Sequence, residues 1–331
     1  MNARSSVAES LVMASGLVSS PPGTVDDTWF DHRVRLGPRG YKYLPPACQY
    51  LLCAAREALS RTGGEAERHP QERRGVVVGT NCAVSALHAD IEETVRDQGI
   101  ERLSPMITPF FSVNLVASRL STEHRFKGFN VTVTSPRTAG IEALHIASQE
   151  LAAGRGDLVL AGVTEAADPR PNTAEPESGA AVLALRPLGA AHAGGDAVLR
   201  TALRFIPPTA LESEAGRRRA EDTVRTALDE LCASAPAPSG ARPASVTLVI
   251  DDSPVAGAVA AAVRGRLGPR ASVSTAFPAA RAGALAPVEV LLSRSDAEDL
   301  GPRLVVVAAR EGNVALGSIS TRPGGDARGA S

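Results

Sequence analysis

Residues 128–144 read Gly128-Phe129-Asn130-Val131-Thr132-Val133-Thr134-Ser135-Pro136-Arg137-Thr138-Ala139-Gly140-Ile141-Glu142-Ala143-Leu144, and they predict a strand, a tight turn and a helix in immediate succession. A sharp turn from a strand into a helix is the geometry of a nucleophile elbow, which presents one side chain next to the helix N–H groups. The residue at this position is Arg137, whose guanidinium stays protonated and is no nucleophile. The sequence therefore predicts a catalytic frame that lacks a catalytic residue.

The composition indicates a globular protein with balanced charge. The 331 residues are 44% hydrophobic, which is ample for a sizeable core, and 35 lysines and arginines offset 36 aspartates and glutamates. This balance gives no support to a nucleic-acid or membrane-surface partner. No apolar run approaches the roughly 20 residues of a membrane span, and the run at 11–19 predicts a first strand rather than a signal peptide. We expect a cytoplasmic protein.

The sequence contains no motif for a metal or a cofactor. Its four cysteines form no CxxC pair and have no neighbouring histidine cluster, so neither a metal site nor a disulfide framework is predicted. Buried thiols are expected at Cys48, Cys53, Cys82 and Cys232. The GxGxxG and GxxxxGK[ST] patterns of nucleotide binding are also absent, and no cofactor is expected.

Strand-like and helix-like segments alternate along the chain. Short apolar runs at 75–80, 158–162 and 246–250 predict buried strands, and the segments between them have helical spacing. This alternation predicts an α/β fold, with a parallel or mixed sheet covered by helices. Both halves follow a β-α-β-α-β-β course, which favours an internal duplication. We expect an N-terminal half at 1–190, a C-terminal half at 191–320 and a disordered tail at 321–331.

Taken in order, several segments resemble the β-ketoacyl synthases, which have the thiolase fold. The similarity covers residues 8–188 and is looser in the second half, where it is best at 282–289. The resemblance implies duplicated βαβαβ halves in a layered αβαβα architecture. The segments that carry it in the first half are 13–20, 74–80, 113–117, 127–134, 154–165 and 178–185.

Each catalytic position of that family is changed here. Its members use a cysteine nucleophile and two histidines. The cysteine position falls on Arg137, the first histidine motif falls near 250–253 with Asp252 as the counterpart, and the second falls near Ala280. No alignment restores the pair, because His192 is the last histidine in the chain. The resemblance therefore implies no catalytic residue and no condensation by this chain alone.

The resemblance also implies a dimer interface and a tunnel contact. Thiolase-fold proteins pair the strand before the elbow across a two-fold axis, which here means Asn130, Val131, Thr132, Val133 and Thr134. A following implication is that Met106, Phe110 and Phe111 shape the acyl tunnel of a partner. The alternative for one of the two phenylalanines is a place in the core.

Three functions remain open from the sequence. The first is a chain-length-factor-like subunit, which pairs with an active ketosynthase and receives acyl chains from an acyl carrier protein. The second is an acyltransferase that uses Cys82 or Ser135 in the same fold. The third is a structural homodimer that binds an acyl carrier protein. For Arg137, the alternatives are a plug of the former active site, a contact to a carboxylate of a partner, or drift without function.

Overall fold

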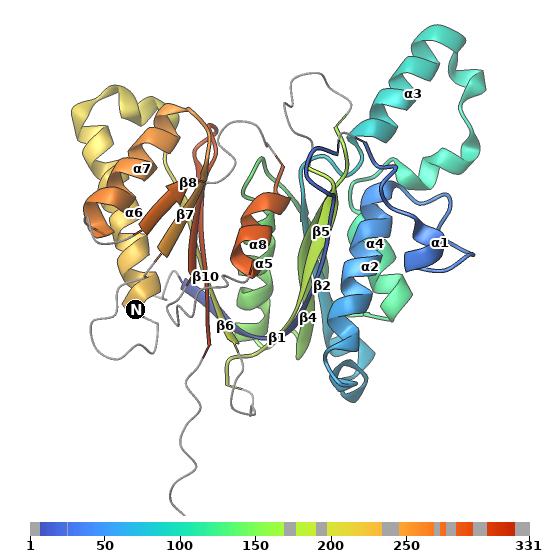
Figure 1. Ribbon diagram of the computed structural model, residues 1–331, viewed down its shortest axis with the longest axis horizontal. Helices are drawn as coiled ribbons and strands as arrows, with labels where there is room; N and C mark the ends of the chain where they lie inside the picture. Colours follow the sequence, from blue (N-terminus) through green and yellow to red (C-terminus); the bar gives the residue numbers. More distant parts are fainter. Residues whose placement is uncertain are drawn as a thin grey trace, which may run out of the picture.

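The computed structural model describes residues 7–24, 26–168, 177–189, 197–233, 245–267, 272–275, 283–293 and 303–321, and two halves of the chain follow a similar course (Figure 1). The first half contains β1 (Val7–Ser19), α1 (His32–Arg35), α2 (Pro46–Ser60), β2 (Arg74–Thr80), α3 (Ser85–Gln98), the 3-10 helix η4 (Pro105–Phe110), α4 (Leu115–His124), β3 (Asn130–Thr134), α5 (Ala139–Ala152), β4 (Leu158–Glu165) and β5 (Gly179–Arg186). The second half contains β6 (Ala197–Phe205), α6 (Glu214–Ala233), β7 (Ser245–Ile250), α7 (Pro254–Leu267), β8 (Ser272–Thr275), α8 (Leu285–Leu292), β9 (Arg303–Ala308) and β10 (Asn313–Thr321).

The described strands form one sheet in which each half repeats the same internal order. From end to end the order is β3-β2-β4-β5-β1-β6-β10-β9-β7-β8. β2 runs parallel to β3 and β4, and β7 runs parallel to β8 and β9, while the other neighbours are antiparallel. β1 and β6 pair at the centre and join the halves. The expected mixed sheet and the internal duplication are therefore confirmed.

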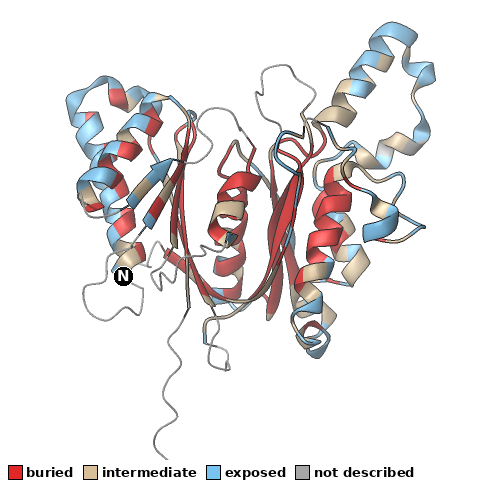
Figure 2. Ribbon diagram, viewed as in Figure 1, coloured by how far each residue is buried: buried red, intermediate tan, exposed pale blue. Residues whose placement is uncertain are grey.

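The sheet bends into two limbs that enclose a central layer of helices. Figure 1 shows α5 and α8 between the limbs, with α2 and α4 outside one limb and α6 and α7 outside the other. Apolar clusters fill each space between the layers. In Figure 2 the buried residues follow α5 and the strands on either side of it. This is the αβαβα architecture that the resemblance implies.

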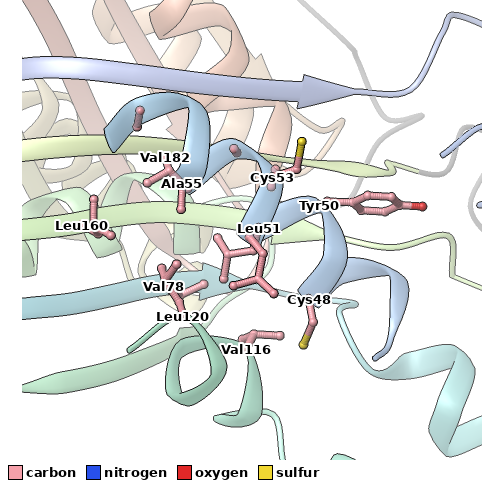
Figure 3. Packing of buried hydrophobic residues seen from close by; sticks show 14 of the residues in the cluster. Cys48, Tyr50, Leu51, Cys53, Ala55, Val78, Val116, Leu120, Leu160 and Val182 are labelled. Atoms are coloured by element: carbon pink, nitrogen blue, oxygen red, sulfur yellow. The ribbon is translucent and has the colours of Figure 1, made fainter. Parts of the chain in front are cut away.

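The core under α2 shows how the sequence builds one of these layers. Figure 3 shows Leu51 of α2 together with Val78 of β2 and Leu120 of α4, and all three are buried. α2 lies very close to β1 because a glycine stands at the crossing. A Cβ at Gly16 would lie 2.0 Å from the carbonyl oxygen of Ala54, so a larger residue there would push the helix away.

The cysteine prediction is correct at three positions and wrong at one. Cys48, Cys53 and Cys82 are buried, whereas Cys232 is only half-buried, because it stands in the last turn of α6. All four thiols are free. Among the described helices, none is long and apolar enough to cross a membrane.

Some sequence predictions fall on residues that the structure does not describe. These are the central part of the loop expected at 168–178, the surface loop at 235–243, the boundary between the halves at 190, and the tail after residue 321.

Candidate functional site

The turn between β3 and α5 has the elbow geometry that the sequence predicts. β3 ends at Thr134 and α5 begins at Ala139. Between them Arg137 has a φ of 61°, a left-handed backbone conformation that residues with a side chain seldom adopt. α5 packs closely on β2 at Gly79, where a Cβ would lie 2.1 Å from the carbonyl oxygen of Ala139. The elbow is therefore present, with Arg137 at its apex.

Arg137 is a buried cation that faces the second half of the chain. Its side chain is 7% exposed, and its Nε lies 3.8 Å from Oδ2 of Asp251, whose side chain is 4% exposed. Its Nη1 is buried without a hydrogen-bond partner among the described residues. Asp251 directly follows β7, so this ion pair connects the elbow of one half with a strand end of the other.

The sequence points to Asp252 as the counterpart of the first histidine, but the structure directs Asp251 toward the elbow. The Asp252 side chain is 85% exposed and lies 3.8 Å from Nη2 of Arg310. Consecutive side chains at a strand end point to opposite sides, so one position separates the buried aspartate from the exposed one. Ala280, the expected counterpart of the second histidine, lies outside the described residues.

The alternative nucleophiles lie in surroundings that lack an imidazole base. Cys82 is 6% exposed, and its Sγ lies 3.6 Å from Oδ2 of Asp168. Reactive cysteines have cationic neighbours, whereas a carboxylate opposes a thiolate. The hydroxyl of Ser135 donates to Oε2 of Glu142 at 2.9 Å, and no described histidine hydrogen-bonds to it. The usual base of an acyl-transfer nucleophile is therefore missing from both positions within the described chain.

A pocket of about 650 Å³ opens beside the start of α3. Phe110 lines it, whereas Phe111 does not and is 58% exposed. The side chain of Met106 is not described. A pocket of this size with a mainly apolar wall fits a hydrophobic chain. The lining residues are Lys42, Tyr43, Leu44, Pro45, Pro46, Ala83, Ala86, Leu87, Asp90, Ser104, Ile107, Phe110 and Ala166.

β3 has one edge that no other described strand covers. It lies at the end of the sheet next to β2. The amide of Val76 in β2 donates to the carbonyl of Phe129 at 2.9 Å, so Phe129 faces β2. Because backbone groups alternate along a strand, Asn130, Thr132 and Thr134 direct their N–H and C=O groups to the uncovered side. The hydroxyl of Thr132 is buried without a partner in the described chain.

Two buried glutamates that sequence reasoning missed lie where the halves meet. Glu165 ends β4 and Glu177 precedes β5, and their exposed fractions are 1% and 7%. Burial raises the pKa of Glu165 to about 7. Burial, together with the charge of Glu165, raises the pKa of Glu177 to about 8. The one sequence signal is that each carboxylate interrupts an apolar segment.

Comparison with known proteins finds relatives of the first half. The family model described as "Beta-ketoacyl synthase, N-terminal domain" matches residues 11–192. The 3-oxoacyl-[acyl-carrier-protein] synthase 2 of Rhizobium meliloti (strain 1021) is 31% identical over 146 residues, which are 44% of this chain and 35% of that relative. The mitochondrial 3-oxoacyl-[acyl-carrier-protein] synthase of Arabidopsis thaliana is 27% identical over 117 residues, 35% of this chain and 25% of the relative. The matches thus span about a third of these relatives, or less.

Solved structures match over nearly the whole chain. The ishigamide ketosynthase/chain length factor has a TM-score of 0.70 at 18% identity, covering 95% of this chain and 99% of that chain. A type II polyketide synthase acyl-carrier protein in complex with its ketosynthase, bound to the hexaketide, gives a TM-score of 0.67 at 14% identity, covering 95% and 99%. At these identities the likeness establishes a shared fold.

Proposed function

The chain belongs to the β-ketoacyl synthase family, and we propose that it is a non-catalytic member, which pairs with an active ketosynthase and shapes the acyl tunnel of the complex. The observation that carries this proposal is the buried ion pair of Arg137 and Asp251 at the elbow. The setting is polyketide or fatty-acid-like biosynthesis, in which an acyl carrier protein delivers the growing chain.

The elbow residues support the loss of condensation chemistry. Condensation needs a thiolate to hold the acyl chain and imidazoles to assist decarboxylation. Arg137 has no unprotonated form that would attack a thioester. Asp251 lies 3.8 Å from both Arg137 and Nε of Arg310, so its carboxylate is already held between two cations. The sequence after His192 contains no histidine to replace it.

The uncovered edge of β3 supports pairing with a partner strand. An antiparallel strand would hydrogen-bond to the outward N–H and C=O groups of Asn130, Thr132 and Thr134. Such an interface would also give the buried hydroxyl of Thr132 a partner. A soluble protein that leaves a sheet edge open risks uncontrolled association, and a specific partner removes that risk.

The apolar pocket supports a role in setting chain length. Phe110 forms part of the pocket wall, and Met106 lies in the same 3-10 helix, η4. A large ring in a tunnel wall limits an acyl chain by steric exclusion. Phe111, which is 58% exposed in the single chain, is free to contact the partner subunit.

A cationic surface next to the pocket supports contact with the acyl carrier protein. Arg33, Arg39 and Lys42 are exposed on the segment that leads into the pocket, and Lys42 belongs to its lining. Complementary charge steers a negatively charged partner toward such a surface.

Native mass spectrometry after co-expression with ketosynthases of the same genome tests the pairing. We expect a one-to-one complex whose condensing activity requires this chain. Thr132→Pro removes one outward N–H of β3 and leaves the bonds to β2 in place, so it should abolish the complex. Thr132→Ala, the matched control, should retain it. A stable homodimer that binds no ketosynthase would refute the proposal and favour the structural homodimer.

Product analysis of the complex tests the tunnel role. Phe110→Ala widens the pocket wall and should lengthen the product, whereas Phe205→Ala, at an exposed residue on the distant β6, should leave its length unchanged. An unchanged product from both variants would remove Phe110 from the proposal. Covalent acylation of the isolated wild-type chain would instead favour the acyltransferase.

A further inference from the structure

Glu165 and Glu177 lie together in a dry site between the halves. Both approach Gly283, since a Cβ there would lie 2.5 Å from Oε2 of Glu177 and 3.3 Å from Cγ of Glu165. Within the described chain, neither carboxylate forms a salt bridge with an arginine, lysine or histidine. Each negative charge raises the cost of the other in such a site, so two ionised carboxylates are strongly disfavoured.

The hydrogen bonds around Glu165 favour its charged form. Its carboxylate accepts backbone N–H groups from Asn81 at 2.7 Å, Cys82 at 2.6 Å and Ala284 at 2.9 Å. It also accepts the hydroxyl of Thr80 at 3.3 Å. Donors on both oxygens stabilise a carboxylate. Because the donors come from the turn after β2 and from the start of α8, Glu165 joins the two halves.

Glu177 has fewer donors, and all of them meet one oxygen. Its Oε2 accepts the N–H groups of Leu285 at 2.9 Å and Ala286 at 3.2 Å, in the first turn of α8. Its Oε1 is buried without a hydrogen-bond partner in the described chain. An unpartnered charged oxygen in a dry site costs more than an unpartnered hydroxyl. Of the two residues, Glu177 is therefore the better place for a proton.

We propose that Glu177 retains a proton near neutral pH, and that the pair is a proton-dependent clasp, which releases the first turn of α8 from the first half as the pH rises. The proton leaves Oε1 for solvent, and both carboxylates are then charged. Water reaching the start of α8 relieves this repulsion, because it solvates the two anions. The clasp is independent of the elbow chemistry and of the proposed partner.

The other ionisable groups around the pair oppose a second negative charge. Glu289 of α8 adds to the rise in the pKa of Glu177. Cys82 and Asp168 lie on the side of the turn after β2. On the side of α2, Asp27 and Tyr50 contact the residue that follows Glu177. Among the described residues these neighbours are acidic or neutral, so they favour retention of the proton.

The raised pKa fixes the direction of the pH effect. The pKa of Glu177 is about 8 in the folded chain and about 4.5 in a solvated state. The stabilising effect of the clasp is complete below the lower value and is lost as the pH rises toward the higher one. Opening releases one proton in this interval, so its equilibrium constant should increase about tenfold per pH unit.

Hydrogen exchange measured by NMR tests the clasp in the full-length chain. The protection factors of the Leu285 and Ala286 amides should fall about tenfold per pH unit between about pH 5 and about pH 8. Glu177→Gln keeps an acceptor for both amides but carries no charge, so its slope should be below about threefold per unit. Glu289→Gln, in the same helix, is the matched control and should keep the wild-type slope.

Two results would overturn the proposal. One is a protection factor in the wild-type chain that does not change with pH once intrinsic exchange is corrected. The other is an equal slope in Glu177→Gln and wild type. If Glu177→Gln does not fold, carbon-13 NMR of the glutamate carboxyls in the wild-type chain decides the matter. A Glu177 carboxyl signal that is already ionised at pH 6 contradicts the proposal, and one that titrates near pH 8 supports it.

Discussion

Replacing Arg137 with methionine and Asp251 with asparagine, singly and together, measures how strongly the elbow pair stabilises the fold. Two unit charges 3.8 Å apart attract by about 4 kcal/mol at an effective dielectric constant of about 20. Removing one partner of a buried pair leaves the other charge uncompensated, so each single variant should lose about 3 kcal/mol in the free energy of unfolding.

The two single variants should differ in a definite direction. Arg137→Met leaves Asp251 with the second cation, Arg310. Asp251→Asn leaves a guanidinium that is 7% exposed without an anion near it in the described chain. We therefore expect Asp251→Asn to cost about 1 kcal/mol more than Arg137→Met.

Urea denaturation of the four proteins gives the coupling energy from a double-mutant cycle. Urea is suited because it does not screen charges. We expect a coupling of about 3 kcal/mol, and Asp252→Asn, whose side chain is 85% exposed, should change stability by less than about 0.5 kcal/mol. A coupling below about 0.5 kcal/mol would refute the reasoning, because the pair would then be incidental to the fold.

Three further predictions concern the elbow and the thiols. Gly79→Ala should destabilise the chain by more than about 2 kcal/mol in urea denaturation, because its Cβ would lie 2.1 Å from the carbonyl oxygen of Ala139; Gly257→Ala, in open space, is the control. Glu142→Gln removes a carboxylate that accepts two hydroxyls in the first turn of α5, and should cost about 1 kcal/mol by the same assay. Iodoacetamide should label Cys232 before the buried thiols, as read by peptide mass spectrometry, and earlier labelling of Cys82 would contradict the described packing.

The fold was largely predictable because its signals are local. The β-branched run before Ser135 and the apolar spacing after Gly140 are enough to place the elbow, and buried parallel strands appear as short apolar runs. The order of such segments, together with the family resemblance, then gives the layers. The identity of Arg137 at the apex required no structure.

The site was less predictable because it depends on contacts between distant segments. Asp251 and Asp252 are equivalent in sequence, and only the end of β7 decides which one reaches Arg137. The neighbouring Phe110 and Phe111 likewise differ in environment, one in the pocket wall and one exposed. The carboxylate pair depends on amides from α8, more than a hundred residues away in the chain.

The left-handed backbone at Arg137 bears on how this family can diverge. An arginine and a cysteine carry the same Cβ, so both meet similar strain at a φ of 61°. The turn therefore does not select for the residue that gives it a chemical purpose. An ancestor could lose its nucleophile in one substitution and pass on the same scaffold, while a descendant that regained the cysteine would still lack both histidines. Inheritance of the shape is in this sense easier than inheritance of the reaction, and gene duplication followed by this kind of loss leaves subunits that only a working sister chain keeps useful.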